Sequence, residues 1–249
     1  MYLRIPLLTW KLLKFLMSSL GMSMKKIKKF RHELKYYINF FEYNVLRDKL
    51  KHVLKRDKYS DGNGEYHIRS LYFDDLHRNA LYEKQAGILS RKKFRIRIYN
   101  FKDDVIKLEI KSRNGQFITK ESSPLTLHQY NAIRNGDYNF LGESRDLVFN
   151  EFYYQITNNR LMPDVIVDYV REAYISDINN IRITFDKNLR TGLADTSLFD
   201  PSLVTVDVIE KPLHVLEIKY DNFLPSHLRN ILQIASNQRY AISKFVVAK

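Results

Sequence analysis

Charged and bulky apolar residues alternate along several segments of the chain. In residues 105–113, Lys, Glu and Arg stand at every second position, with Ile, Leu and Ser between them, and residues 31–36, 93–99 and 216–219 repeat the pattern. A period of two residues predicts β-strands. Because charges of both signs share one face, the repetition favours a barrel with a charged interior. Ordinary amphipathic strands whose charged faces point to water are the alternative.

The remaining patterns predict further strands and several helices. The Asn114-Gly115 turn indicates a hairpin and therefore antiparallel pairing. Thr126 and Ser144 are hydroxyl residues suited to N-capping the two helices that follow. Strands are expected at residues 27–39, 66–73, 163–175, 180–190 and 213–221 and in three parts of 91–121; helices are expected at 41–55, around Ala80, at 126–134 and 144–158, and from Pro225 with Leu228, Ile231, Leu232 and Ala235 inward.

Length and composition narrow the classes of protein. A chain of 249 residues can bury a full core and is expected to form one domain, or one barrel with appended helices. The chain has no cysteine, which excludes disulfides and thiolate metal sites. Its net charge of +13 indicates an anionic partner, which could be nucleic acid, phosphate esters or a membrane surface.

The first 26 residues form a basic amphipathic extension. Apolar residues fall at helical spacing, but Arg4, Lys11 and Lys14 make the segment too interrupted for a transmembrane helix. It could instead be an interfacial helix that makes peripheral membrane contact or binds a membrane protein. There are two other interpretations: the segment is a poor secretory signal, or it is an upstream extension and the true start is Met22 or Met24. A cytoplasmic protein, with or without membrane association, is expected.

The common sequence signatures of catalysis are missing. The chain has no GxxxxGK[ST], GxGxxG, HExxH or GxSxG motif, so the chemistry must lie in the charged strand residues. Arginine can bind two phosphate oxygens with its planar fork, and lysine adds a movable charge. Carboxylates cannot bind phosphate directly but can hold a bridging divalent metal. The basic candidates are Arg31, Lys35, Arg95, Arg97, Lys111, Arg171, Arg182 and Lys219, and the acidic ones are Glu33, Glu109 and Glu217.

Eight short motifs occur in a fixed order between residues 27 and 247. They are Arg31-His-Glu-Leu-Lys35-Tyr, Ile68-Arg-Ser-Leu-Tyr-Phe-Asp-Asp75, Arg95-Ile-Arg97, Leu108-Glu-Ile-Lys111-Ser-Arg113, Tyr169-Val-Arg171-Glu-Ala-Tyr174, Arg182-Ile-Thr-Phe-Asp186, Leu216-Glu-Ile-Lys219 and Ser243-Lys-Phe245. In these motifs the chain resembles the catalytic domain of the vacuolar transporter chaperone (VTC) polyphosphate polymerases. That domain belongs to the triphosphate tunnel metalloenzyme, or CYTH-like, superfamily.

The resemblance implies an α+β, mainly β fold, in which residues 27–249 form an eight-stranded antiparallel tunnel with a charged interior and flanking helices. It also implies an enzyme that transfers the γ-phosphate of ATP to polyphosphate, with Mn²⁺ or Mg²⁺ as cofactor and no specific nucleic acid as partner. The implied catalytic residues are Lys35, Arg95, Arg97, Lys111, Arg171, Arg182 and Lys244; the implied substrate-binding residues are Arg31, Lys120, Tyr169, Lys219 and Ser243; and the implied metal ligand is Glu217, with Glu33 and Glu109 as further candidates.

One departure from the superfamily pattern bears on the reaction. Tunnel hydrolases typically carry Glu-x-Glu-x-Lys near the start of the chain, whereas this chain has Arg31-x-Glu33-x-Lys35. The exchange of a carboxylate for a cation weakens the case for a two-metal hydrolytic site and favours a polymerase. A metal-dependent tripolyphosphatase or nucleoside triphosphatase, and a non-catalytic polyphosphate-binding module, remain the alternatives. RNA binding is disfavoured because most aromatic residues alternate onto the face opposite the charges.

Overall fold

The computed structural model describes residues 31–115, 117–193, 195–233 and 238–249. Its main feature is one antiparallel sheet of eight long strands. Two short strands, β2 (Lys55–Arg56) and β9 (Val206–Asp207), pair with β7 and β8 at its margin. In spatial order the long strands are β1 (Arg31–Ile38), β10 (His214–Asp221), β8 (Ile181–Thr191), β7 (Met162–Ser176), β3 (Glu65–Asp74), β4 (Ser90–Tyr99), β5 (Lys102–Asn114) and β6 (Phe117–Leu125).

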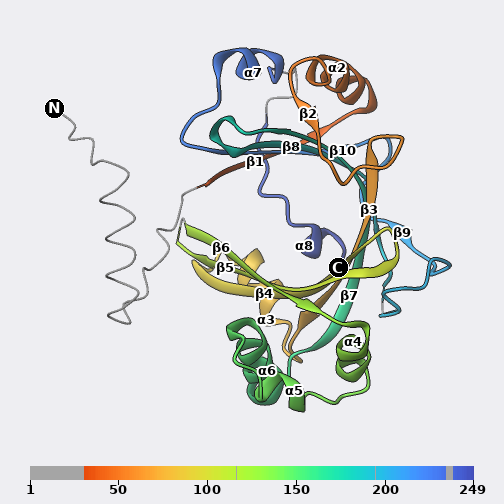
Figure 1. The fold of residues 1–249 in the computed structure, drawn as a ribbon. Helices are drawn as coiled ribbons and strands as arrows, with labels where there is room; N and C mark the ends of the chain where they lie inside the picture. Colours follow the sequence, from red (N-terminus) through yellow and green to blue (C-terminus); the bar gives the residue numbers. More distant parts are fainter. Residues whose placement is uncertain (1–30, 116, 194, 234–237) are drawn as a thin grey trace, which may run out of the picture.

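The sheet curls around a central space (Figure 1). Strands β1, β8 and β10 form an upper layer, β4, β5 and β6 form a lower layer, and β3 and β7 join the two as a side wall. Within the described residues, β1 and β6 end the strand order and share no ladder, so the sheet is not closed. The expected eight-stranded antiparallel fold is confirmed, in the form of an open-sided tunnel.

Helices cover the outer face of both layers (Figure 1). Over the upper layer, Leu46 and Leu50 of α2 (Phe40–Leu50) join one apolar core with Phe185. Under the lower layer, Phe152 of α6 (Leu147–Asn159) joins a second core with Leu108. The strands of the upper and lower layers therefore turn an apolar face outward, where helices cover it, and a charged face inward. Also present are α3 (Asn79–Gln85), α4 (Leu127–Arg134), α5 (Asn139–Gly142), α7 (Ser226–Ile231) and a 3₁₀ turn (Ile178–Asn180).

The two predicted N-caps have different outcomes. Thr126 caps α4 as expected, because its hydroxyl accepts from the backbone N–H of Gln129 while the Gln129 side chain accepts from Thr126. Ser144 does not cap α6. The cap is Asp146, whose carboxylate accepts from the N–H of Val148 at 2.8 Å. A carboxylate at the positive end of a helix is the stronger acceptor, and Ser144 instead accepts from the N–H of Asp146.

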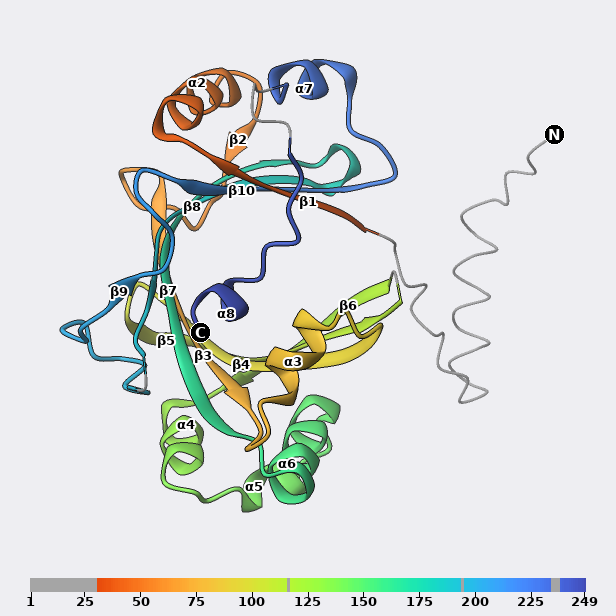
Figure 2. The same ribbon diagram turned by 180° about the vertical axis from the view of Figure 1, so that it is seen from behind.

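The C-terminal helix α8 (Lys244–Val247) has no counterpart among the expected elements. Both ribbon views place it within the curl of the sheet, between the two layers (Figures 1 and 2). Phe245 and Ala248 are buried in a third apolar core together with Tyr72 and Tyr169. Among the expected features of the preceding helix, Leu228 is buried, whereas Ala235 lies outside the described residues.

A buried charged cluster ties β3 to β7 and β8 away from the charged interior. The carboxylate of Asp168 accepts from His67 Nε2 at 2.8 Å, Arg69 Nε at 2.8 Å and Arg190 Nη2 at 2.9 Å. Burial alone would raise the pKa of Asp168, but the hydrogen bond and charge of His67 and then those of Arg69 lower it to about 2. The stabilisation from Asp168 is therefore present above its ordinary pKa of 3.8 and is lost as the pH falls through about 2.

We expect Asp168→Asn to lower the free energy of unfolding by about 3–5 kcal/mol at neutral pH, because it leaves buried Arg69 without its carboxylate. The difference between variant and wild type should shrink as the pH falls from about 4 to 2. Urea unfolding at a series of pH values measures it. A difference that stays constant over this range would show that the Asp168 carboxylate is not the stabilising group.

Candidate phosphate-binding site

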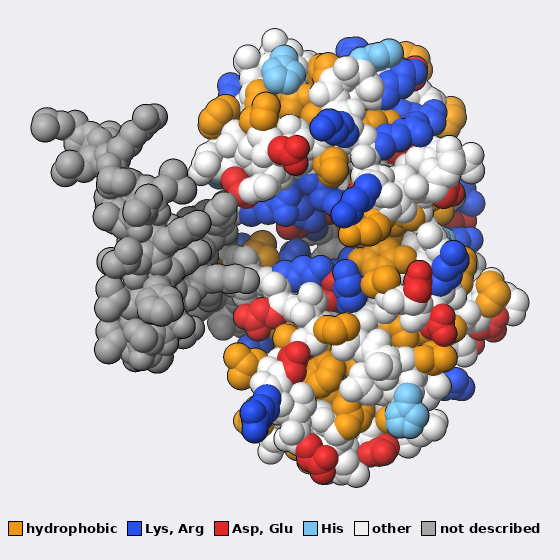
Figure 3. Space-filling model, in the orientation of Figure 1, with side chains coloured by type: hydrophobic (Ala, Val, Ile, Leu, Met, Phe, Trp, Pro, Cys, Tyr) orange, Lys and Arg blue, Asp and Glu red, His pale blue; other side chains and the backbone are white. Residues whose placement is uncertain are grey.

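The inward faces of both layers carry the charged residues (Figure 3). Lys and Arg side chains gather around the hollow between the upper and lower halves of the molecule. The strand register explains this, because Glu33 stands opposite Lys219, and Lys35 stands opposite Glu217, on the paired strands β1 and β10. Residues opposite one another on paired strands share a face of the sheet. The alternation in the sequence thus becomes a set of charged rows along the interior.

Glu217 is the carboxylate of the upper layer with the most cation contacts. It is 4% exposed and lies 2.9 Å from Lys219 Nζ, 3.5 Å from Lys35 Nζ and 3.7 Å from Arg171 Nη2. Burial alone would raise the pKa of Glu217, but the surrounding cations, led by Lys219, hold it well below its usual range. Glu217 is therefore ionised at neutral pH.

Lys35 lies between Glu217 and Glu33, a second carboxylate of this layer. Its Nζ lies 2.9 Å from Glu33 and donates to the Ile242 carbonyl at 3.0 Å. Burial disfavours the charged form, yet Glu217 and Glu33 outweigh it and raise the pKa of Lys35. Lys219 behaves in the opposite way, because burial exceeds the attraction of Glu217 and lowers the pKa of Lys219 to about 8. The two lysines therefore hold their protons with very different strength.

Asp186 organises the cations on the side wall, and sequence reasoning missed it as a site residue. Its carboxylate accepts from Arg171 Nε at 2.6 Å and Nη2 at 2.8 Å and lies 2.5 Å from Lys244 Nζ. Both cations also lie over the ring of Tyr169, at 5.2 and 5.1 Å from its centroid. Burial opposes ionisation, but Arg171 and then Lys244 lower the pKa of Asp186 to about 2. Asp186 thus holds Arg171 and the helix α8 together.

The lower layer carries a second network around Glu109, which is 1% exposed. Arg95 donates to Glu109 at 2.6 Å and to the Tyr72 hydroxyl at 2.7 Å. Lys120 of β6 contacts the same carboxylate, so its side chain also points into the interior. Burial would raise the pKa of Glu109, but Arg95 and the other cations lower it. Arg97 donates to Ser70 at 3.0 Å and to the Tyr169 hydroxyl at 3.3 Å.

An ion pair between two predicted site residues, Lys111 and Glu33, joins the lower layer to the upper layer across the interior. Lys111 Nζ of β5 lies 3.5 Å from both carboxylate oxygens of Glu33 on β1. These two strands are not neighbours in the sheet. The contact shows that the charged faces approach closely enough for one polyanion to bind both.

Within the described residues, two predicted cations contact none of the four carboxylates Glu33, Glu109, Asp186 and Glu217. Arg31, at the start of β1, is exposed and donates to the Asn180 carbonyl at 2.8 Å. Arg182 contacts Asp57 at 2.7 Å and the Tyr66 hydroxyl at 2.7 Å. Ser243 lies inside, where its hydroxyl is 3.1 Å from Lys93 Nζ. The structure thus brings most of the predicted set together and leaves Arg31 at the margin.

Several interior residues escaped the sequence reasoning although a signal existed. Lys93 has the same strand parity as Arg95 and Arg97, and Asp186 has the same parity as Arg182. Three tyrosines are exceptions to the expectation that most aromatic residues lie on the face opposite the charges. The hydroxyls of Tyr66, Tyr72 and Tyr169 accept hydrogen bonds from interior arginines.

The donor set for a divalent metal consists of few carboxylates. Among the residues that the structure describes, no group of three or more His, Asp or Glu could form a cage around a metal ion. Glu217 stands opposite Thr184 on β8, whose buried hydroxyl has no hydrogen-bond partner. Magnesium in phosphate-transfer sites is commonly held by one or two carboxylates together with substrate phosphates. Glu217 fits that kind of site, in which the substrate supplies the remaining ligands.

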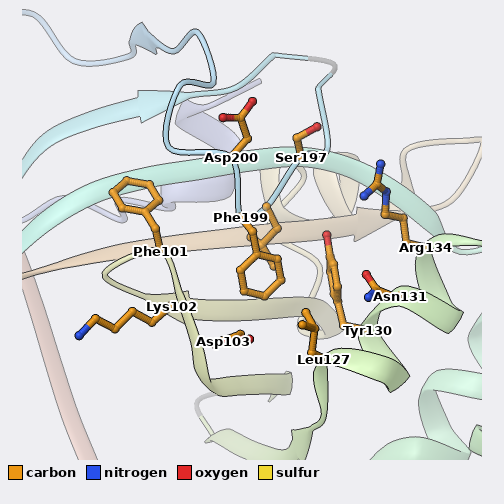
Figure 4. Close-up of a pocket in the computed structure, with 11 residues that line it drawn as sticks. Phe101, Lys102, Asp103, Leu127, Tyr130, Asn131, Arg134, Ser197, Phe199 and Asp200 are labelled. Atoms are coloured by element: carbon orange, nitrogen blue, oxygen red, sulfur yellow. The ribbon is translucent and has the colours of Figure 1, made fainter.

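A separate cavity of about 640 Å³ lies outside the charged interior, between α4 and residues 197–200 (Figure 4). Its wall includes Phe101, Tyr130 and Phe199 together with charges of both signs. Tyr130 and Phe199 fill part of the space by packing edge to face at 5.0 Å. None of the predicted site residues lines this cavity, so the candidate site is the interior of the sheet.

Comparisons with known proteins agree with this geometry. The model of the VTC domain family matches residues 30–248. The fold is similar to that of a candidate adenylate cyclase from Bacillus halodurans, with a TM-score of 0.50, 12% identity and coverage of 86% of this chain and 94% of that one. It is also similar to a candidate adenylate cyclase from Vibrio parahaemolyticus, with a TM-score of 0.50, 11% identity and coverage of 88% and 97%. None of the curated proteins compared with the sequence matches it. In the described part of the chain, no helix combines the length and apolar character needed to span a bilayer.

Proposed function

The chain belongs to the VTC domain family, and we propose that it is a polyphosphate polymerase, which transfers the γ-phosphate of ATP to the end of a polyphosphate chain inside the open-sided tunnel. In this proposal residues 27–249 form the single catalytic domain. Contact of residues 1–26 with a membrane surface or a membrane protein stays a prediction, as does a cytoplasmic location, because that segment lies outside the described residues.

The charge balance of the interior carries the proposal. Five carboxylates of the interior each contact at least one cation, and the interior cations outnumber them. This excess of positive charge favours the binding of two polyanions together over the activation of water by a carboxylate. The cations are Lys35, Lys93, Arg95, Arg97, Lys111, Lys120, Arg171, Arg182, Lys219 and Lys244; the carboxylates are Glu33, Asp57, Glu109, Asp186 and Glu217.

In the proposed reaction, a terminal phosphate oxygen of the acceptor attacks the γ-phosphorus of ATP. A new P–O–P bond forms, the bond from the γ-phosphorus to the β-bridging oxygen breaks, and its electron pair leaves with ADP. No side chain has to act as nucleophile, so catalysis rests on positioning and on neutralisation of charge. Residues on both layers would bind phosphates: Lys35, Arg95, Arg97, Lys111, Arg171, Arg182 and Lys244, assisted by Arg31, Lys120, Tyr169, Lys219 and Ser243.

Glu217 is the residue that we propose as the main metal ligand, with Glu33 and Glu109 as secondary candidates. A divalent cation, Mn²⁺ or Mg²⁺, would supply further neutralisation of the transferred phosphate when bound. Lys35 and Lys219 keep Glu217 ionised and in place. The ionised state is the one that a divalent cation requires.

We expect ATP and Mn²⁺ to give ADP and a phosphate polymer, with free orthophosphate as a minor product. Added polyphosphate should shorten any lag, because it supplies acceptor ends. Exchange of one phosphoanhydride for another is close to balance, so ADP with long polyphosphate should give some ATP. Gel sizing of the polymer and assays of ADP, ATP and orthophosphate measure these outcomes.

Orthophosphate that appears in step with ADP, without polymer under any primer condition, would replace the proposal by a tripolyphosphatase or nucleoside triphosphatase. Binding of polyphosphate without any turnover would indicate a binding module. Binding of RNA as tight as that of polyphosphate would contradict the assignment of polyphosphate as the polymeric ligand.

A further inference from the structure

The floor of the open-sided tunnel carries cations that directly face one another across strands. Arg91 of β4 stands opposite Arg113 of β5, and in the next inward row Lys93 stands opposite Lys111, which stands opposite Lys120 of β6. Like charges that face one another across strands destabilise a sheet. Two consecutive rows of this kind are therefore unfavourable in the empty protein and need a reason outside folding.

Carboxylates compensate only part of these rows. Lys111 contacts Glu33, and Lys120 contacts Glu109. Among the described residues, by contrast, Arg91, Lys93 and Arg113 have no carboxylate within 4 Å, and Glu83 of α3 compensates them only from a longer distance, where it raises the pKa of Arg91 less than burial and Arg113 lower it. Arg91 and Arg113 donate to the backbone carbonyls of Ile88 and Gly115. The uncompensated positive charge thus lies where β4 begins and β5 ends.

Lys93 is the inner member of this uncompensated group. Its Nζ lies 3.1 Å from the Ser243 hydroxyl and 4.4 Å from the centroid of the Phe245 ring, so α8 holds it on the inward face. Burial, followed by the charges of Lys84 on α3, Arg91 and Lys111, lowers the pKa of Lys93 to about 7, while Asp74 opposes the shift only weakly. The protein therefore holds the Lys93 side chain in the interior but supplies too little negative charge to balance it.

We propose that Arg91, Lys93 and Arg113, with Lys84 beside them, form a further anion-binding position that takes the phosphate groups of a polyphosphate chain beyond those held by Arg95 and Arg97. This inference rests on the proposed function, because it assigns the substrate chain to one end of the same interior. Two arginines, each with a forked set of donors, and two lysines suit several neighbouring phosphate groups better than they suit a single carboxylate. Arg97 and Arg95 stand two residues apart on the inward face of β4. Lys93 and then Arg91 continue the same row at the same spacing.

The chain-length dependence of binding tests this position. A tripolyphosphate is too short to occupy both the Arg95–Arg97 region and the Arg91–Arg113 row, whereas a long chain reaches both. We expect Lys93→Met combined with Arg91→Gln to weaken long polyphosphate roughly tenfold or more, because charge-assisted hydrogen bonds are lost. The affinity for tripolyphosphate should change by less than about twofold. Calorimetric titration without ATP, at one fixed salt concentration, measures both.

Lys92→Met is the matched control. Lys92 neighbours both replaced residues but has the opposite strand parity, and it contacts Glu151 at 2.7 Å on the outer face. Its replacement should leave both affinities unchanged. The thermal unfolding of each empty variant is measured first, and removal of like charges should leave the double variant at least as stable as wild type.

A proton-uptake measurement gives an independent readout. Because the lowered pKa leaves Lys93 largely neutral at pH 8, a bound polyanion should restore its proton. Calorimetric titration of long polyphosphate in two buffers of different ionisation enthalpy should show net proton uptake at pH 8. Lys93→Met should remove that part of the uptake, and uptake equal in variant and wild type would overturn the role of Lys93.

The outcomes separate this inference from the proposed function. Equal weakening of tripolyphosphate and long chains would place Lys93 within the triphosphate site, and no weakening of either would remove it from binding; both overturn the inference. Polymer synthesis by wild type is measured separately. If the chain-length difference appears without polymer synthesis, the position is supported and the polymerase reaction is not.

Discussion

Glu217→Gln is expected to lower the rate of polymer synthesis by about 10²- to 10³-fold, the loss that follows removal of one preorganised electrostatic group. The amide keeps the shape of the side chain but lacks the charge that would hold a divalent cation. Affinity for Mn²⁺ in the presence of a non-hydrolysable ATP analogue should fall together with the rate. Calorimetric titration of Mn²⁺ and a polymer assay measure the two effects.

The fold should survive this substitution because the partners of Glu217 are mostly shared. Lys35 keeps its contact with Glu33, and Arg171 keeps its two hydrogen bonds to Asp186. Lys219 alone among these three loses its carboxylate within the described residues. Burial already lowers its pKa, and the loss of Glu217 would lower it further, so Lys219 can become neutral in the variant.

A matched control for Glu217→Gln is Glu151→Gln. Glu151 lies on the outer helix α6 and pairs with Lys92, so it tests removal of a paired carboxylate away from the interior. Its replacement should leave rate and metal affinity unchanged. Unchanged Mn²⁺ affinity in Glu217→Gln would move the metal site to Glu33 or Glu109, and unchanged activity would contradict the role of Glu217 altogether.

The sequence predicts which residues share the interior because a strand has a fixed period of two. Once β5 and β10 are recognised as strands, the facing of Glu109, Lys111 and Glu217 follows without knowledge of the fold. The same rule applied one step further would have included Lys93, which precedes Arg95 by one period. The signal was present, because Lys93 is the first residue of the alternating segment 93–99.

Other features depend on contacts that periodicity cannot encode. The pairing of Lys35 with Glu217 joins positions far apart in the chain, and it requires β1 to lie beside β10. The position of α8 depends on Phe245 packing against Tyr72 and Tyr169, and a four-residue helix has too short a pattern to predict. Local alternation therefore predicts the composition of the site, whereas tertiary packing decides which charges neutralise one another.

The interior charges have two roles that oppose one another. Phosphate-binding cations must be held in place in the empty protein, and an internal carboxylate can do this by taking the position of an anion. Asp186 does so for Arg171 and Lys244. A substrate phosphate that binds the same cations then meets repulsion from Asp186. The carboxylate that stabilises the fold should therefore weaken substrate binding.

Asp186→Asn is expected to lower the free energy of unfolding of the empty protein by about 3–5 kcal/mol, because buried Lys244 loses its counterion and Arg171 keeps only its longer contact with Glu217. For a domain of this size, that loss corresponds to a fall in Tm of roughly 6–20 °C. Tripolyphosphate should bind the variant more tightly than wild type and raise its Tm by more, since the ligand restores the missing charge. Scanning calorimetry with and without tripolyphosphate measures both shifts.

Asp207→Asn is the control, because Asp207 pairs with Lys211 at the exposed surface. Its Tm should change by less than the equivalent of about 1 kcal/mol, and its response to tripolyphosphate should equal that of wild type. A variant of Asp186 that is as stable as wild type would show that the buried ion pair does not stabilise the fold. A variant that is destabilised but gains no more from tripolyphosphate than wild type would show that Arg171 and Lys244 hold the fold together without binding phosphate, and both would then leave the proposed set of phosphate ligands.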